Sequence, residues 1–545
     1  MAIVKVPKKE IEKYVKLTEE NIERMNLMGI PIESIRDEEI EVEVMPNRPD
    51  ALSIQGYLRA LKAYFGKESG LKKYKLKKPE KNYEVKVDCS LKDIRPYTAC
   101  AIIKNLKFDD EKIKEIIDIQ EKMHSTVGRN RKKVAIGIYP LEKISLPIKF
   151  EAIKPKEIRF VPLDSEREMN GLEILQSHPK GREYAHLLEG MEKFPVFKDQ
   201  KGKILSMPPI INSNDTGKIS ESTTEIFIEC SGSDFEILQK TLNIIATVFA
   251  EMGGTIYQME VNYGKKEITP DLTPSRMKIS LENANKLLGL SLKEKDLEAL
   301  LPKMGYDYHK GYVKIPAWRM DILHEVDIIE DIAIAYGYDR LEPEIPKIAT
   351  VGEESKESRL RNIATDILTG LGLIEASSYH LIKDEEIKFT DIKDRIELEN
   401  SKTEYKFLRS NLLIPILRII SENKDKEYPQ RIFEIGTVFL KEGGQKTETG
   451  IAEKENLIVA YTPGNFTELK EALEYLFKML GTGYSVREGS KKGFIEGRTG
   501  EILFGGKSIG YIGEIHPDTL RAMNLKLPCT VFEISLNEIL EDIYG

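Results

Sequence analysis

The sequence predicts an α+β protein of several domains, and three observations lead to that prediction. The chain has 545 residues, which suggests about three to five domains at roughly 150 residues each. Hydrophobic residues make up 41% of it, so the chain can bury real cores. Segments with the alternation of strands are interspersed with segments of helical period. Composition shifts then divide the chain into four regions, 1–80, 81–266, 267–346 and 347–545.

The four regions differ in their predicted elements. The first is a small strand–turn–helix module that ends in a lysine-rich connector at 71–81. The second is rich in predicted sheet and contains two predicted helices, at 111–123 and 234–251. The third is another small strand–turn–helix module, bounded by prolines. The fourth opens with a predicted helix at 358–370 and continues with strand-like segments.

Charge and cysteine content exclude several classes of protein. The formal net charge is −8, which argues against a protein that coats nucleic acid but leaves room for a local basic patch. No stretch approaches the ~20 apolar residues of a membrane span, and the N-terminus lacks a signal peptide. We therefore expect a cytoplasmic protein with no membrane contact. Four cysteines without a C-x-x-C pair are expected to be reduced thiols: Cys89, Cys100, Cys230 and Cys529.

An internal repeat relates the first and third regions. Residues 45–66 align without gaps on residues 316–337, and the alignment pairs Arg48 with Arg319 and Asp50 with Asp321. Each copy follows a short strand and ends in glycine, as expected for a strand, a turn and a capped helix. Coincidence between two common units is the alternative, but the specific matches favour two related modules.

The second copy carries an acidic cluster that the first copy lacks. Three of its members share one face of the predicted helix, opposite a predicted apolar stripe of Val326, Ile329, Ala333 and Tyr336. Like charges at this spacing destabilise a helix by a few tenths of a kcal/mol, and Mg²⁺, which prefers carboxylate oxygens, would offset that cost. In the alternative, Asp321 is an N-cap and the other acids form a solvated face that suits the helix dipole. The cluster consists of Asp321, Asp327, Glu330 and Asp331.

A basic run lies just before a predicted strand of the second region. Phosphate oxygens of a nucleic acid such as tRNA are one partner for such a run. The alternative is a charged loop beside an edge strand, where lysine discourages edge pairing. The candidate tRNA contacts are Arg129, Arg131, Lys132 and Lys133.

Polar side chains also gather where two strands of the second region end. Strand ends are where pockets form, although ordinary turns use the same residue types. The chain has no nucleophile elbow, zinc-binding helix or phosphate loop. Any hydrolysis would therefore rely on positioned water and oxyanion donors. The candidate pocket residues are Asn212, Ser213, Glu229, Ser231 and Asp234.

Several motifs, found in order along the chain, resemble the β subunits of phenylalanine–tRNA ligases. They include IPAWRMDILHEVDIIEDIAIAYGYDRLEP at 315–343, EVEVMPNRPDALSIQGYLRALKAYFG at 41–66 and PPIINSND at 208–215. The resemblance extends over essentially the whole chain. Because the chain is too short for the extra domains of bacterial members, it is similar to the archaeal and eukaryotic type.

The resemblance implies roles for the candidate residues. Asp321, Asp327, Glu330 and Asp331 would be Mg²⁺ ligands shared with an α subunit. Region 81–266 would be an editing domain that hydrolyses tyrosine from mischarged tRNA-Phe. Editing has a physical motive, since an apolar pocket rejects an added hydroxyl by only about a hundredfold. The sequence departs from the family's usual Asp-Val-Thr-Gly-Thr-Asp-like run, with Glu-Cys-Ser-Gly-Ser-Asp at 229–234.

Region 347–545 resembles a class II synthetase domain, built on antiparallel sheet, that has lost its chemistry. The second signature motif of active members needs Arg-x-Glu, and the matching run here is Arg409-Ser410-Asn411. ATP-dependent charging of tRNA-Phe is therefore expected on the α subunit, in an (αβ)₂ heterotetramer. Two other hypotheses remain: a paralogue that only binds RNA or DNA, and a scaffold with an inactive editing pocket.

Overall fold

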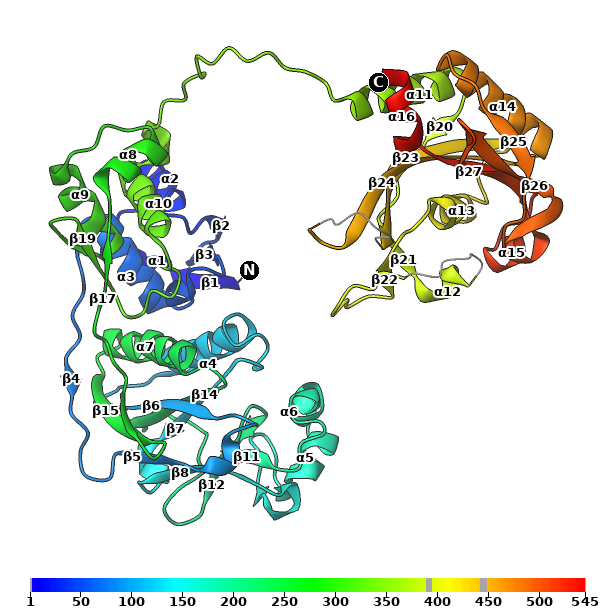
Figure 1. Cartoon of the computed structure of the whole chain (residues 1–545). Helices are drawn as coiled ribbons and strands as arrows, with labels where there is room; N and C mark the ends of the chain where they lie inside the picture. Colours follow the sequence, from blue (N-terminus) through cyan, green and yellow to red (C-terminus); the bar gives the residue numbers. More distant parts are fainter. Residues whose placement is uncertain (1, 389–394, 442–447, 545) are drawn as a thin grey trace. The chain divides into compact units, whose positions relative to one another are not determined.

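The computed structural model describes residues 2–388, 395–441 and 448–544. The chain forms two compact units, residues 1–345 and 346–545 (Figure 1). Both mix helices with sheets, as the predicted α+β class requires. Among the described residues, no helix is both long enough and apolar enough to cross a membrane.

The first unit begins with a small module in which three antiparallel strands carry helices. The strand order is β1-β3-β2, and Thr18 and Ser53 cap the two longer helices by accepting from backbone N–H groups. The elements are β1 (Ala2–Pro7), α1 (Lys8–Glu12), α2 (Glu19–Asn26), β2 (Ile32–Ile35), β3 (Glu39–Val44) and α3 (Ile54–Tyr64).

A large mixed sheet follows. Its main path runs β13-β12-β11-β8-β5-β15-β6-β14-β7, with β4 and β16 paired to β15. The strands are β4 (Leu76–Lys77), β5 (Glu84–Val87), β6 (Tyr97–Lys104), β7 (Val134–Pro140), β8 (Ile148–Ile153), β11 (Phe194–Lys198), β12 (Ile204–Met207), β13 (Ile211–Asn212), β14 (Ile226–Gly232), β15 (Thr255–Asn262) and β16 (Lys266–Thr269). A separate two-stranded sheet joins β9 (Arg159–Phe160) and β10 (Met169–Asn170).

Helices α4 (Asp110–Ser125) and α7 (Phe235–Glu251) cover one face of this sheet. Both were predicted within two residues at each end, because each has a clear apolar stripe and an aspartate N-cap. Ile226, Ile228 and Cys230 of β14 point to this face and share one core with the N-terminal module. Phe227, which alternates with them, packs in the core on the opposite face. Two shorter helices, α5 (Gly171–Ser177) and α6 (Pro179–Tyr184), lie between β10 and β11 in the chain.

The third region is a second small module with its own core. Its strands are in the order β17-β19-β18. Helix α10 begins at Glu325, so Asp321 precedes the helix and His324 is the N-cap residue in its place. The elements are β17 (Ser275–Lys278), α8 (Leu281–Leu288), α9 (Glu294–Leu300), β18 (Asp307–His309), β19 (Tyr312–Ile315) and α10 (Glu325–Tyr336).

The second unit is built on a sheet with strand order β20-β23-β24-β28-β27-β26-β25 in its described part, antiparallel except for the β20–β23 pair. The strands are β20 (Ile374–Glu375), β23 (Gln430–Lys441), β24 (Ile451–Thr462), β25 (Ser485–Glu488), β26 (Phe494–Phe504), β27 (Lys507–Ile515) and β28 (Thr530–Ser535). A smaller pair joins β21 (Leu381–Lys383) and β22 (Tyr405–Leu408), next to α12 (Asp384–Ile387).

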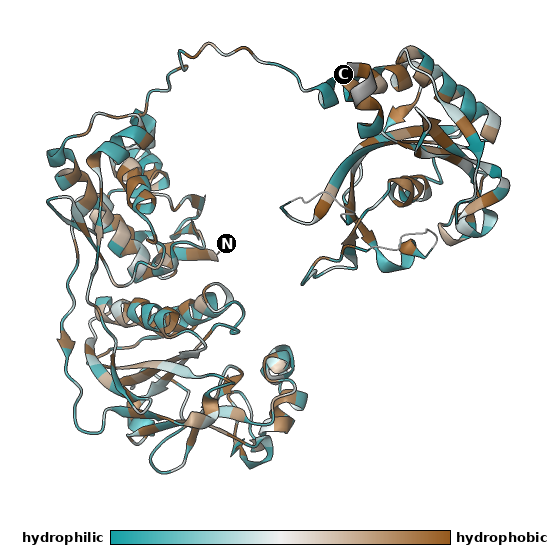
Figure 2. Cartoon of the chain, viewed as in Figure 1, coloured by the Kyte–Doolittle hydropathy of each residue, from teal (hydrophilic) through white to brown (hydrophobic). Residues whose placement is uncertain are grey.

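Helices cover both faces of the larger sheet. Leu457 and Val459 of β24 pack in one core with α11 (Lys356–Gly370), α14 (Phe466–Met479) and α16 (Asn537–Tyr544). Ile458 and Ala460 pack on the other face against α13 (Leu413–Glu422), near α15 (Pro517–Ala522). A strand buried on both faces is apolar throughout, which explains the run at 457–461. Hydrophilic and hydrophobic stretches alternate along α7 and α14, as expected for helices with one buried face (Figure 2).

Candidate functional site

A cavity of about 450 Å³ lies in the sheet-rich region of the first unit. The two ends of the large sheet, β7 and β13, both contribute to its wall, and α4 provides a third side. Most of the wall is apolar, and a few polar side chains interrupt it, which is the usual composition of a small-molecule site. The apolar lining includes Ile113, Ile116, Ile117, Ile136, Ile138, Ile210, Ile211 and Ile219, and the polar lining includes Gln120, Glu121, His124, Arg131, Asn212 and Glu229.

Glu229 is the buried acid of this cavity, with 2% of its surface exposed. Its Oε1 lies 3.2 Å from the hydroxyl of Tyr139, which is also 3.3 Å from Oδ1 of Asn212. The single proton of that hydroxyl can serve only one of these acceptors at a time. Oε2 of Glu229 has no hydrogen-bond partner among the described residues. The acid thus keeps one buried oxygen without a partner in a side chain that lines an apolar cavity.

Burial decides the protonation state of Glu229. Loss of solvation raises the pKa of its carboxyl to about 8, although nearby Arg95 and the hydroxyls of Tyr139 and Ser231 favour the charged form. Glu229 is therefore mostly protonated at neutral pH and can donate a hydrogen bond as well as accept one. The strand opposite leaves room for it only because residue 137 is glycine. A Cβ on Gly137 would lie 2.5 Å from Oε1 of Glu229 and 2.2 Å from the Tyr139 oxygen.

A second polar group lies on the α4 side of the cavity. Nε2 of His124 accepts from the backbone N–H of Ile136 at 2.9 Å, so its proton resides on Nδ1. Burial lowers the pKa of His124, which keeps the ring neutral. Glu121 lies beside it, 3.8 Å from Nδ1, and accepts from Nη2 of Arg131 at 2.8 Å. Interactions with His124, then with Arg131, lower the pKa of Glu121 to about 2.

The structure brings two of the five predicted pocket residues into the cavity wall. Asn212 and Glu229 line it. Ser231 accepts from Arg95 at 3.1 Å, away from the wall, and Asp234 caps α7 by accepting from two backbone N–H groups. Ser213 is buried and its backbone N–H donates to the carbonyl oxygen of Leu205.

Sequence reasoning missed Tyr139 as the partner of Glu229 and Glu121 as the partner of Arg131. It also missed His124, which lines the cavity. Tyr139 could have been predicted, because it lies two residues after Gly137, on the same face of a strand that is otherwise apolar. The other two belong to the polar side of a helix, where the sequence pattern indicates only a solvated face.

The predicted basic run divides into exposed and buried members. Arg129 and Lys132 are exposed and Lys133 is half-buried. Arg131 is buried, with 8% of its surface exposed, and lines the cavity. A charged loop on the surface therefore describes only part of the run, because one guanidinium turns inward.

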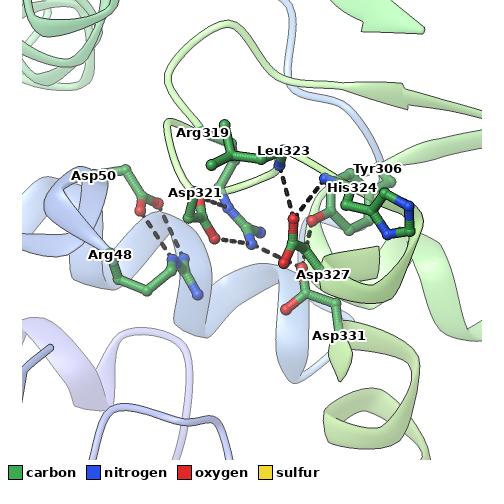
Figure 3. Close-up of polar contacts among 9 residues, drawn as sticks. All are labelled: Arg48, Asp50, Tyr306, Arg319, Asp321, Leu323, His324, Asp327 and Asp331. Carbon is green, nitrogen blue, oxygen red and sulfur yellow. Dashed lines mark hydrogen bonds and ion pairs between the residues drawn. The ribbon is translucent and has the colours of Figure 1, made fainter. Parts of the chain in front are cut away.

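The predicted acidic cluster forms a different arrangement in the third region (Figure 3). Arg319 donates to both oxygens of Asp321, at 2.8 and 2.6 Å, and to Asp331 at 2.8 Å. Tyr306 donates to the same Asp331 oxygen. Asp331 therefore lies buried rather than on an acidic surface, because a buried cation compensates its charge.

The other two acids serve separate purposes. Asp327 accepts from the backbone N–H groups of Leu323 and His324, both at 2.7 Å, and so closes the first turn of α10. Glu330 is exposed. The predicted apolar stripe is wrong at Val326, which is 48% exposed, and the buried face instead includes Ile328 and Ile332. Ile329 and Ala333 are buried as predicted, so the buried face is broader than the predicted stripe and includes Asp331.

The first copy of the repeat contains the same ion pair. Arg48 donates to both oxygens of Asp50, at 2.9 and 3.0 Å, as Arg319 does to Asp321. Both arginines line one small cavity between the two modules (Figure 3). Gly56 occupies the repeat position of Asp327, and a Cβ there would lie 1.9 Å from the carbonyl oxygen of Asp50. The turn is thus shared, while the side chains on the helices differ.

Groups of the chain itself already hold most carboxylates of the acidic cluster. Within the described ranges, no group of three or more histidine, cysteine, aspartate or glutamate side chains is arranged to hold a metal ion. Arg319 occupies both oxygens of Asp321 and contacts Asp331, and backbone N–H groups occupy an oxygen of Asp327. The donor chemistry suits Mg²⁺, but further ligands would have to come from outside the chain.

In the second unit, the side chain of Arg409 is deeply buried just after strand β22. Arg409 donates to Glu434 at 2.7 Å and to the Ser378 hydroxyl at 2.7 Å, and both charged side chains are 2% exposed. Arg409, the first residue of the run that matches the second signature motif, is therefore held in an internal ion pair.

Comparisons with known proteins agree with this architecture. Residues 101–246 match the family described as B3/4 domain, residues 277–338 the tRNA synthetase B5 domain, and residues 341–536 the phenylalanyl tRNA synthetase beta chain CLM domain. The phenylalanine–tRNA ligase β subunit of Thermococcus sibiricus is 41% identical over 500 residues, which cover 90% of this chain and 89% of that protein. The β subunit from Archaeoglobus fulgidus is 36% identical over 551 residues and 98% of both chains.

A solved structure resembles the first unit. The crystal structure of an N-terminal fragment of the phenylalanyl-tRNA synthetase β subunit from Pyrococcus horikoshii has a TM-score of 0.58 and 37% sequence identity. The match covers 61% of this chain and 99% of the fragment.

Proposed function

The chain belongs to the family of phenylalanine–tRNA ligase β subunits. We propose that the ester bond between tyrosine and mischarged tRNA-Phe is hydrolysed in its cavity. The buried Oε2 of Glu229 lacks a hydrogen-bond partner, and its side chain lines an apolar wall; this is the observation that carries the proposal. Tyrosine differs from phenylalanine by one hydroxyl. A buried polar group that would otherwise lack a partner favours the ligand that brings that hydroxyl.

The cavity supplies separate features for the ring and for the hydroxyl. The isoleucine wall accommodates the aromatic ring of the substrate, as apolar pockets do. A protonated Glu229 donates to the phenol oxygen, while Tyr139 and Asn212 hold Oε1 and the hydroxyl network in place. A phenylalanyl group would leave Glu229 unpartnered and would bind less tightly. The cavity would therefore spare correctly charged tRNA.

The hydrolytic step needs a positioned water and no covalent enzyme intermediate. Water adds to the ester carbonyl, and the ribose oxygen of the tRNA leaves with a proton. Positioning alone can supply much of the rate. His124 remains neutral and Glu121 remains ionised at neutral pH, so both are in the states that orient water by hydrogen bonding.

The test is deacylation of Tyr-tRNA-Phe by the chain co-expressed with its α subunit. Glu229→Ala should lower the deacylation rate by roughly tenfold or more, the equivalent of one lost hydrogen bond. The matched control is Asp234→Ala, which removes a nearby carboxylate that caps α7 outside the cavity wall. Equal deacylation by the wild type and Glu229→Ala would refute the assignment. A complex that charges phenylalanine but never deacylates would reduce the chain to a scaffold.

Three further parts of the proposal concern the holoenzyme. The α subunit carries the ATP-dependent charging of tRNA-Phe in an (αβ)₂ assembly, since Arg409 of this chain is engaged by Glu434.

Mg²⁺ would bind at the Glu330 edge of the acidic cluster, and ligands from the α subunit would complete its coordination. The exposure of Glu330 supports this proposal. Arg129, Lys132 and Lys133 contact the tRNA backbone, as their charge and accessibility favour.

A further inference from the structure

We infer that Arg131 is a positioning residue that fixes the width of the cavity; this inference rests on the proposed function. Its Nη1 donates to the carbonyl oxygen of Ile210 at 2.8 Å, and its Nη2 donates to Glu121 at 2.8 Å. Ile210 immediately precedes β13, and Glu121 belongs to α4. One guanidinium therefore joins two opposite walls of the cavity, which lie far apart in the sequence.

The surroundings of Arg131 hold its planar head in one orientation. The ring of Tyr184 in α6 lies 4.5 Å from the guanidinium carbon, a cation–π distance. The backbone N–H of Arg131 donates to the carbonyl oxygen of His124. Its own carbonyl oxygen accepts from Arg95 at 3.5 Å. A lysine would keep the backbone contacts but could not make both hydrogen bonds of the guanidinium in this geometry, because its single ammonium lacks the planar fork of arginine.

The backbone of the loop supports the same conclusion. Three consecutive residues without a glycine have positive φ: Arg129 at 46°, Asn130 at 53° and Arg131 at 64°. This left-handed region is unfavourable for residues other than glycine and persists where surrounding contacts enforce it. Here the reversal turns Arg131 into the cavity wall, while Arg129 stays exposed.

The link between the walls has a functional consequence. The isoleucines of α4 and those of the 210–211 segment face one cavity, so the separation of these two elements sets the space for an aromatic ring. Loosening the link should impair the placement of the ester more than the attraction of the tRNA. The effect should therefore fall on kcat more than on KM.

The test compares deacylation of Tyr-tRNA-Phe by the αβ complex for Arg131→Met, Arg131→Lys and Arg167→Met. We expect Arg131→Met to lower kcat at least tenfold with less change in KM, and millimolar guanidinium ion to restore part of the activity. Arg131→Lys should stay impaired. Arg167→Met, a matched change at an exposed arginine outside the cavity wall, should leave kcat unchanged and gain nothing from guanidinium.

The outcomes separate this inference from the proposed function. Normal deacylation by Arg131→Met, or a loss that guanidinium does not relieve, would overturn the inference while wild-type activity still supports editing. If Arg131→Met does not fold, Glu121→Leu removes the acceptor at one end of the link and should give a partial loss of kcat. An unchanged kcat would overturn the inference as well. Absence of deacylation in the wild type would remove both proposals, with phenylalanine charging as the check on the complex.

Discussion

Each of the two units contains a buried glutamate, and the two side chains differ in their hydrogen-bond partners. Glu229 in the first unit faces a cavity and keeps one oxygen without a partner. Glu434 in the second unit is bound by Arg409 and by the Ser378 hydroxyl, in the interior of a sheet covered by helices. Both carboxylates are 2% exposed. Burial therefore does not distinguish a site from a core, but an unsatisfied oxygen beside a cavity does.

The largest effect on stability is expected when the ion pair between Arg409 and Glu434 is broken. Arg409→Met leaves Glu434 buried without its cation and should destabilise the second unit by roughly 3–5 kcal/mol. Chemical denaturation followed by circular dichroism measures this loss. The only tryptophan, Trp318, lies in the first unit, so its fluorescence transition should stay where it is.

A double variant serves as the control for Arg409→Met. Replacing Glu434 by Gln in the same chain removes the uncompensated charge and should recover part of the lost stability. A single variant as stable as the wild type would mean that Glu434 is neutral in the folded chain or reaches solvent. The contrast between the paired and the unpaired glutamate would then fail.

The unpaired glutamate predicts a dependence of stability on pH. The pKa of Glu229 is about 8 in the folded chain against 4.5 ordinarily, so the folded state holds its proton while the unfolded state releases it. Between these values the unfolded state binds fewer protons, and stability must fall as pH rises. The loss should approach a few kcal/mol above about pH 8, and Trp318 fluorescence during denaturation reports it.

Glu229→Gln is the matched control, because glutamine has nearly the same shape and does not titrate. This variant should lose the component of the slope between about pH 5 and 8 that the wild type shows. Parallel stability curves for the two proteins would show that Glu229 titrates normally. In that case the donor role proposed for its protonated form would have no basis.

How much could be predicted differs between elements and contacts. Helices α4, α7 and α11 were predicted within two residues, because each combines a 3.6-residue apolar period with a side-chain cap. The repeat correctly paired Arg48 with Arg319, and both make the same ion pair with an aspartate two residues on. Local signals thus determine local structure.

The cavity could not be predicted from local sequence patterns. Its wall joins β7 to β13, which meet only because nine strands follow one another along the main path of the sheet. No periodicity indicates that Arg131 lies opposite Ile210, or that Asp331 turns toward Arg319 and not toward solvent. Charged residues at helical spacing predict a solvated face, and the exceptions depend on partners that only the folded chain supplies.

Asp327 extends the comparison to a third kind of carboxylate, one that is neither free nor paired with a cation. It accepts from the backbone N–H groups of Leu323 and His324 at the start of α10. Asp327→Ala should therefore cost about 1 kcal/mol, the usual value of a lost cap. The matched control is Glu330→Ala, on the same helix but exposed, which should stay within about 0.5 kcal/mol of the wild type. Denaturation followed by Trp318 fluorescence measures both, and a larger loss for Glu330→Ala would mean that the acid on the surface, not the cap, stabilises this module.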